Sequence, residues 1–106
     1  MGTGGTISGT SKFLKEKNPE LKTIGVDPIG SILADYKATG KMVEAKSYLI
    51  EGVGEDIIPD NVKFEFIDEF VKVGDEEAIR ILHRLAKEEG IFAGSSCGLA
   101  VAGALS

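Results

Sequence analysis

The residues best suited to chemistry form a glycine-rich turn near the start of the chain, at 2–6. Backbone N–H groups in such a turn are open to an anion, because glycine has no Cβ to keep it away. The helical segment that follows leaves further N–H groups unpaired in its first turn, with the positive end of the peptide dipoles behind them. A phosphate site is one interpretation, and a simple change of chain direction is the other. The candidate phosphate ligands are Gly2, Thr3, Gly4, Gly5 and Thr6.

Two later clusters also place glycines where a strand or loop meets another element. The first is the segment EGVGEDIIP at 51–59, and the second is EGIFAGSSCG at 89–98. Three such junctions in one short chain indicate a single ligand cleft. The first cluster is also compatible with a solvated surface turn, and the two serines of the second are compatible with caps of a helix.

Alternating helical and extended segments must position these residues. Helical spacing begins at Ile7 and ends before Pro19, which cannot continue a helix. Ser31 is a candidate cap for a short second helix. Asp75 is expected to cap a third helix that ends at Gly90. The last helix is predicted to start at one of the two serines of the second cluster.

Short apolar segments between the predicted helices have the character of strands. They lie at 22–28, 67–73 and 91–93. Because helices separate them, the strands are expected to run parallel, with helices on the faces of the sheet. The sequence therefore predicts an α/β fold in which ligands bind at the carboxyl ends of the strands.

Four blocks of the sequence are similar, in order and spacing, to consecutive blocks of a known enzyme family. They are GTGGTISG, IGVDPIGSIL, EGVGEDIIP and EEGIFAGSSCGLAVAGAL. Over essentially its whole length the chain resembles the pyridoxal-phosphate (PLP) enzymes of the cystathionine β-synthase and cysteine synthase family. The resemblance implies part of the larger, PLP-binding domain of a fold-type II (tryptophan synthase β-like) enzyme, an α/β domain in which helices flank a parallel sheet.

The resemblance also implies roles for the glycine clusters. Residues 2–6 would bind the cofactor phosphate, and Ser96 would form a hydrogen bond with the pyridine nitrogen. A neutral hydroxyl lets that nitrogen stay unprotonated and weakens the electron sink, which favours loss of a β-substituent over transamination. Gly52, Val53 and Gly54 would line the active site.

Other parts of the family pattern do not occur in these 106 residues. Family members carry the lysine that attaches the cofactor, and a Thr-Ser-Gly-Asn-Thr loop, well upstream of the glycine turn. None of the ten lysines in this chain has that context. The resemblance therefore implies that residues 1–106 are a fragment of one PLP-binding domain without a catalytic residue of its own. The lysine-bearing segment and a smaller domain would lie outside it, and the isolated fragment is expected to be inactive.

The reaction that the resemblance implies is β-replacement on L-serine, in which homocysteine condenses with serine to cystathionine. Glu51 favours this reaction over the alternative, a cysteine synthase that uses O-acetylserine and sulfide, because a glutamine is common at this position in sulfhydrylases. A hypothesis from another class is a non-catalytic anion-binding or structural fragment. The implied partners are a small amino acid and a thiol, and the full-length enzyme is expected to be a cytoplasmic homodimer in cysteine biosynthesis.

Composition restricts the class of protein further. The formal net charge of −5 argues against a nucleic-acid partner, which needs clustered Lys and Arg. No apolar run approaches the roughly 20 residues that cross a bilayer, so no membrane association is expected. His83 has no partner at metal-ligand spacing and Cys97 is the sole cysteine, so we expect no metal site.

Overall fold

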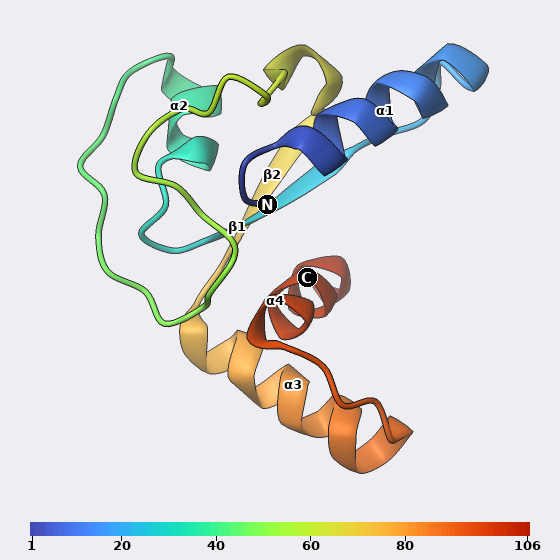
Figure 1. Cartoon of the computed structure of the whole chain (residues 1–106), viewed down its shortest axis with the longest axis vertical. Coiled ribbons are helices and arrows are strands. Elements are labelled where there is room, and N and C mark those ends of the chain that lie inside the picture. Colours follow the sequence, from blue (N-terminus) through green and yellow to red (C-terminus); the bar gives the residue numbers. More distant parts are fainter.

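Helical and extended segments alternate along the chain, as the sequence predicts. The structure is a computed structural model that describes residues 1–106. Two parallel strands lie at its centre, with helices on both sides of them (Figure 1). In chain order the elements are α1 (Gly5–Lys17), β1 (Ile24–Pro28), α2 (Leu33–Thr39), the 3-10 turn η1 (Phe64–Phe66), β2 (Glu69–Val73), α3 (Asp75–Glu89) and α4 (Ser95–Leu105).

The two strands pair in register, with Val26 of β1 opposite Val71 of β2. Side chains alternate between the two faces of a strand. Val26, Val71 and Val73 accordingly pack with residues of α3 and α4, whereas Phe70 packs against the cluster that contains Leu33 of α2. A Cβ on Gly25 would lie 2.7 Å from the Phe70 ring, so this glycine makes room for the ring.

The hydrophobic core consists of two clusters, one on each face of the strands. In Figure 1, α1 and α2 lie above the strands, and α3 and α4 lie below them. The helices α3 and α4 approach closely because Gly98 of α4 lies against the Ala78 carbonyl, where a Cβ would collide. The cluster beneath the strands contains Ile50, Val73, Ala78, Ile81, Leu99 and Ala102, and the other contains Leu33, Val62 and Ile67.

Two helices end where the sequence predicts. The last residue of α1 is Lys17, directly before Asn18 and Pro19. The helix α3 ends with Gly90 in the left-handed region, at a φ of 67°, as a glycine at this position favours. None of the helices combines the length and the apolar character that spanning a bilayer requires.

The strand predicted at 91–93 is wrong. The N–H of Ile91 donates to the carbonyl of Leu85 at 3.0 Å and so completes the end of α3. Phe92 is 97% exposed. An extended segment gains ladder hydrogen bonds only beside another strand, and β1 pairs with β2 alone.

The predicted cap of α3 also needs correction. The residue that precedes α3 is Gly74, and Asp75 lies inside the first turn, where its side chain caps nothing. Its carboxylate accepts a hydrogen bond from the N–H of Leu49 at 2.9 Å instead. The start of α3 was therefore predicted to within one residue, but the Asp75 side chain bonds the segment around Leu49 and does not cap the helix. The helix α4 begins at Ser95, one of the two serines predicted to start it, and follows Gly94 without a side-chain cap.

A long segment without regular structure, at 40–63, connects α2 to η1. Figure 1 shows it running from α2 down to the start of α3 and back up to η1. The cluster Gly52-Val53-Gly54 lies within this segment, and no helix or strand adjoins it in the sequence. Its position therefore depends on contacts with other parts of the chain.

Candidate functional site

One cavity of about 850 Å³ brings together residues from separate parts of the chain. It lies among the start of α1, the strand β1, the loop at 52–53 and the start of α4. Ile7, Val26 and Leu99 contribute apolar side chains to its walls. Seven of the nine site residues predicted from the sequence line it, namely Gly2, Thr3, Gly4, Thr6, Gly52, Val53 and Ser96.

The glycine turn is shaped by Gly4, the residue that precedes α1. Gly4 is buried and has a φ of 90°, which strongly favours glycine. A Cβ there would lie 2.8 Å from the Cα of Val62, so the site has no room for a side chain. The first helical hydrogen bond joins the N–H of Ser8 to the Gly4 carbonyl at 2.9 Å, and the N–H groups of residues 5–7 have no partner in the chain. An anion at the turn would satisfy them.

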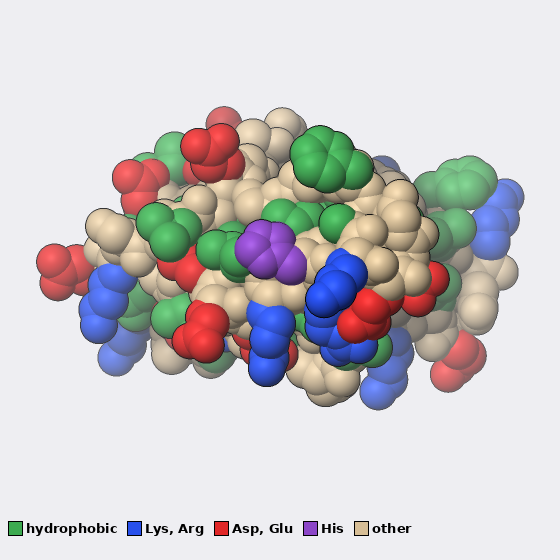
Figure 2. All heavy atoms as spheres, turned by 90° about the horizontal axis from the view of Figure 1, so that it is seen from below, with side chains coloured by type: hydrophobic (Ala, Val, Ile, Leu, Met, Phe, Trp, Pro, Cys, Tyr) green, Lys and Arg blue, Asp and Glu red, His purple; other side chains and the backbone are tan.

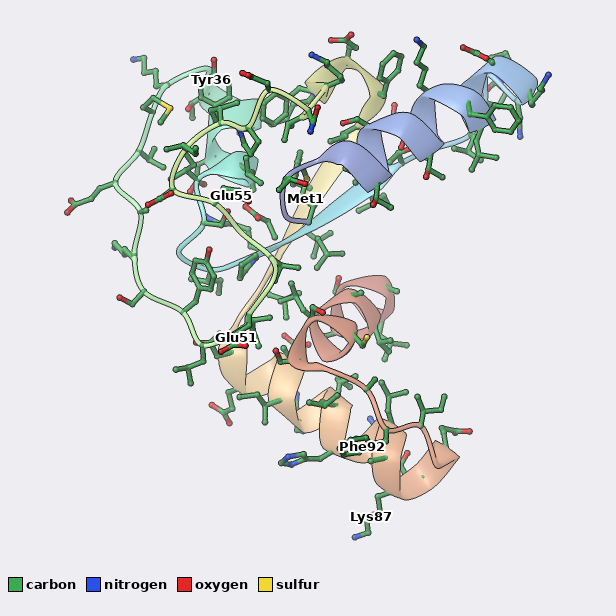
Figure 3. The ribbon with its side chains drawn as sticks, viewed as in Figure 1. Met1, Tyr36, Glu51, Glu55, Lys87 and Phe92 are labelled. Atoms are coloured by element: carbon green, nitrogen blue, oxygen red, sulfur yellow. The ribbon has the colours of Figure 1, made fainter.

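The loop at 52–54 meets the glycine turn directly. The N–H of Gly54 donates to the carbonyl of Met1 at 2.6 Å. A Cβ on Gly2 would lie 3.0 Å from the carbonyl oxygen of Gly52. In Figure 3, Glu55 lies where the loop passes the labelled Met1 at the start of the chain. The two glycine segments therefore form adjoining parts of one wall.

Ser96 lies in the first turn of α4 and borders the cavity. No side-chain oxygen caps this helix. The hydroxyl of Ser95 accepts a hydrogen bond from the N–H of Glu51 at 3.4 Å, whereas the hydroxyl of Ser96 has no partner in the chain. The structure thus argues against the alternative that these serines are helix caps, and it leaves the Ser96 hydroxyl free for a ligand.

Charge around the cavity favours an anion. The chain carries 17 acidic residues, yet none of them lines the cavity. Lys22 is the one charged side chain at its border, and it pairs with Glu69 in an exposed contact of 3.6 Å. The starts of α1 and α4 both open onto the cavity. The positive ends of two helix dipoles therefore contribute to its potential.

Two predicted site residues lie away from this cavity. Gly5 borders a smaller hollow beside Ser8 and Lys12, and a Cβ on Gly5 would meet no atom within 4 Å. Gly54 lies against Tyr48 and Pro28, and a Cβ there would collide with both. The structure thus leaves Gly5 only its backbone N–H as a contact with a ligand, and Gly54 an effect on the shape of the loop.

No role was predicted for Asp27, and Ser31 was predicted to cap a helix. The carboxylate of Asp27, at the end of β1, accepts a hydrogen bond from the N–H of Ala34 at 3.0 Å and caps α2. The Ser31 hydroxyl accepts a hydrogen bond from the N–H of Glu55 at 3.0 Å and a longer one, of 3.5 Å, from the N–H of Leu33 at the start of α2. Burial raises the pKa of Asp27, and the hydrogen bond from Ala34 opposes that shift. The Asp-Pro pair after an apolar strand was the available signal for a polar group at this strand end.

His83 and Cys97 are exposed and lie outside the cavity. Figure 2 shows His83, the sole histidine, at the surface close to Lys and Arg side chains. It borders a shallow hollow along α3 with Arg80 and Arg84. No group of three or more His, Cys, Asp or Glu side chains is arranged to hold a metal ion.

The cavity residues fit a ligand with one anionic end and a flat apolar body. The free N–H groups after Gly4 suit a phosphate, and Val53 and Leu99 offer apolar surface to a ring. Ser96 offers a neutral hydroxyl to a ring nitrogen. PLP combines a phosphate, a flat ring and a pyridine nitrogen, so the donor set and the walls suit this cofactor.

Comparison with known proteins matches the whole chain to one family of enzymes. The family described as pyridoxal-phosphate dependent enzyme matches residues 1–106. A cystathionine β-synthase of Dictyostelium discoideum is 44% identical over 104 residues, which cover 98% of this chain and 20% of that protein. Cysteine synthase A of Salmonella typhi is 38% identical over 107 residues, which cover 99% of this chain and 33% of that protein. The chain thus spans between a fifth and a third of the length of these relatives.

A solved structure shares the fold described above. It is a hydrogen sulfide-producing enzyme of Fusobacterium nucleatum, which superposes with a TM-score of 0.86 at 33% sequence identity. The match covers 99% of this chain and 34% of that chain. The predicted α/β fold class is confirmed by this similarity and by the parallel pairing of β1 and β2.

Proposed function

The chain belongs to the family of pyridoxal-phosphate-dependent enzymes, and on this premise we propose that the cavity holds the phosphate and the ring of PLP. The family and the cofactor predicted from the sequence motifs are confirmed by the match over residues 1–106. The observation that carries the proposal is a cavity with free N–H donors and no acidic side chain, in a chain whose net charge is −5. A phosphate satisfies those donors there, and no carboxylate borders the cavity to repel it.

Each part of the cavity has its own task in the proposed binding. The free N–H groups at the start of α1 and the hydroxyls of Thr3 and Thr6 hold the phosphate, with charge-assisted hydrogen bonds of roughly 1.5–3 kcal/mol each. Ser96 gives the pyridine nitrogen a neutral partner, which does not hold it protonated as a carboxylate would. When bound, the cofactor supplies an electron sink for bonds at the α-carbon of an amino acid.

The proposed reaction of the whole protein is β-replacement on L-serine, with homocysteine as the thiol and cystathionine as the product. Similarity to the Dictyostelium cystathionine β-synthase supports it, and Gly52 and Val53 shape the pocket for the amino acid. We place the lysine that attaches the cofactor outside residues 1–106, because Lys22 alone reaches the cavity and it pairs with Glu69. Residues 1–106 would form one piece of the PLP-binding domain, in a cytoplasmic homodimer.

A second candidate is a cysteine synthase that uses O-acetylserine and sulfide. Similarity to cysteine synthase A of Salmonella typhi over 99% of this chain supports it. The two reactions share loss of a β-substituent and addition of a thiol, so the cavity described here serves either. They differ in the leaving group and in the size of the nucleophile.

The experiment that tests the proposed function uses the full-length protein loaded with PLP. Cystathionine is measured from serine and homocysteine and from O-acetylserine and homocysteine, and cysteine is measured from O-acetylserine and sulfide. We expect the first pair to react fastest. Faster reaction of the third pair would favour the cysteine synthase, and no reaction of any pair would refute β-replacement. The 106-residue chain alone is expected to be inactive in all three assays.

A pair of variants tests the role of Ser96 in the same protein. Ser96→Asp is expected to retain PLP but to lose β-replacement and to change the absorption of the bound cofactor, because a carboxylate holds the pyridine nitrogen protonated. Ser96→Ala removes one neutral hydrogen bond and should retain measurable turnover. An aspartate variant with parental turnover and absorption would show that Ser96 does not face the nitrogen.

A further inference from the structure

The turn between β1 and α2 holds together the two ends of the loop at 46–55, part of which lines the cavity. Three consecutive residues, 30–32, bind both ends of the loop. The Gly30 carbonyl accepts a hydrogen bond from the N–H of Lys46 at 2.9 Å, and the N–H of Ile32 donates to the Glu55 carbonyl at 3.1 Å. The Ser31 hydroxyl accepts the N–H of Glu55 at 3.0 Å. Both main-chain groups of Glu55 are therefore bound by neighbouring residues of one turn.

Ser31 is the most protected of the side chains that hold this loop. It is 1% exposed, and the adjacent Ile32 is fully buried. The two other side-chain bonds to the loop, from Asp75 and from Ser95, lie in solvent-exposed surroundings. Water replaces an exposed hydrogen bond readily, whereas it has less access to the partly buried bond between the Glu55 N–H and the Ser31 hydroxyl. The bond from Ser31 to Glu55 is therefore the side-chain contact on which the loop depends most.

The position of Glu55 affects the cavity because the residues that directly precede it line or adjoin the cavity wall. Gly54 precedes it directly and donates its N–H to the Met1 carbonyl at 2.6 Å, beside the glycine turn. Val53 and Gly52 come next, and both line the cavity. Only four residues separate the bonds at Glu55 from the cavity wall at Gly52, counting both ends. A shift of Glu55 is therefore expected to move Gly52 and Val53.

We propose that Ser31 is a positioning residue of the site: its hydroxyl holds the main chain of Glu55 and thereby fixes Gly52 and Val53 against the bound amino-acid substrate. This inference rests on the proposed function, in which the loop shapes the substrate pocket. Ser31 itself does not line the cavity. Its effect is therefore on the fit of the substrate, and neither on cofactor binding nor on the chemical step.

The test replaces Ser31 by alanine in the full-length, PLP-loaded protein. Hydrogen–deuterium exchange of the peptide at 51–56 is expected to become about tenfold faster, because the N–H of Glu55 loses its acceptor. Exchange in α3 and the absorption of the bound cofactor should not change. The KM for the amino acid is expected to rise about three- to tenfold, with kcat within about twofold of the parent.

Ser8→Ala is the matched control. Ser8 is also buried, and its hydroxyl accepts a main-chain N–H, from Lys63 at 2.9 Å, but it does not line the cavity. This variant should leave exchange at 51–56 and the KM unchanged. If Ser31→Ala folds poorly, Ser31→Cys keeps most of the volume with a much weaker acceptor and should give the same changes.

Unchanged exchange at 51–56 in both Ser31 variants would overturn the proposal, and so would an equal change in the Ser8 control. Exchange is measured without substrate, so this result does not depend on which reaction the protein catalyses. Faster exchange with an unaltered KM would show that Ser31 holds the loop but does not position a substrate, which also contradicts the proposal. Absence of activity in the parent protein, with faster exchange in the variant, would count against the proposed function alone.

Discussion

The glycine turn at 2–6 and the loop at 46–55 line the same cavity but are held in place by different means. The turn leads directly into α1, and its direction is set by the conformation of Gly4. The loop adjoins no helix or strand, and three side chains that lie 24 to 44 positions away in the sequence bind it. The turn therefore depends on the backbone conformation of Gly4 and its close packing on Val62, and the loop on hydrogen bonds from distant side chains, so substitutions should act differently in the two.

The largest expected effect is that of Gly4→Ala, at the centre of the turn. A positive φ costs an L-residue roughly 1–2 kcal/mol. The new Cβ would also lie 2.8 Å from the Cα and 2.9 Å from the N of Val62, and overpacking of this kind costs about 1–3 kcal/mol. We therefore expect the free energy of unfolding of the full-length protein to fall by about 2–5 kcal/mol in urea.

The same variant should also bind PLP more weakly, because the turn must move to relieve the contact with Val62. Cofactor retained after dialysis measures this loss. Parental stability in Gly4→Ala would mean that the turn is not held by the geometry described here. A stability loss with full cofactor retention would mean that the turn is structural and does not bind the phosphate.

The sequence predicts locally determined features well and distant ones poorly. Pro19 and Gly90 mark helix ends through their own backbone restrictions, so both ends were predicted from single residues. The strand at 91–93 was wrong, since a strand requires a neighbour that no local pattern reveals. Ser31 and Asp75 were recognised as polar residues near helix starts, but their partners in the loop lie 24 and 26 positions away. For the same reason the three glycine clusters predicted a single cavity, but they did not show which distant side chains hold the cluster at 51–59 in place.

Glycines of the loop should respond more mildly, and unequally. Gly54 and Gly52 both have positive φ, 75° and 74°. A Cβ on Gly54 would collide with the Tyr48 hydroxyl and lie 2.7 Å from the Cγ of Pro28, whereas one on Gly52 would meet no atom within 4 Å. Because Tyr48 is half-buried and its ring can move, we expect Gly54→Ala to cost about 2–3 kcal/mol and Gly52→Ala about 1–2 kcal/mol. Equal losses in thermal unfolding of the two variants would contradict the crowding around Gly54.

Asp27, which lies shortly before the turn at 30–32 that holds the loop, should make the stability of the protein depend on pH. The glycine turn at 2–6 has no such titratable side chain. Burial raises the pKa of Asp27, so the folded state binds its proton more tightly than the unfolded chain does. Below the ordinary carboxyl pKa this has no cost, because the group is protonated in both states. As the pH rises through the raised pKa the group ionises in the folded state, and the associated loss of stability is then complete.

Asp27→Asn removes this titration and keeps an oxygen to accept the N–H of Ala34. The stability of the variant relative to the parent should therefore improve as the pH rises from the acid range towards neutrality. Urea unfolding at a series of pH values measures the difference. A difference that is constant with pH would show that Asp27 does not titrate at a raised pKa, and the cap of α2 would then be insensitive to its charge.

The smallest expected effect separates two roles of glycine within the turn itself. Gly5 is the first residue of α1, its φ is not positive, and a Cβ there would meet no atom within 4 Å. Alanine restricts the unfolded chain more than glycine does, so Gly5→Ala should stabilise the protein by about 0.4–1 kcal/mol.

The N–H of residue 5 remains available, and the added methyl group lies outside the main cavity. We therefore expect PLP retention to stay within about twofold of the parent, since a backbone donor is unchanged by the substitution. A tenfold loss of cofactor with increased stability would mean that the Cβ position of residue 5 faces the phosphate. In that case the turn would need glycine both for its own conformation at Gly4 and for the approach of the ligand at Gly5.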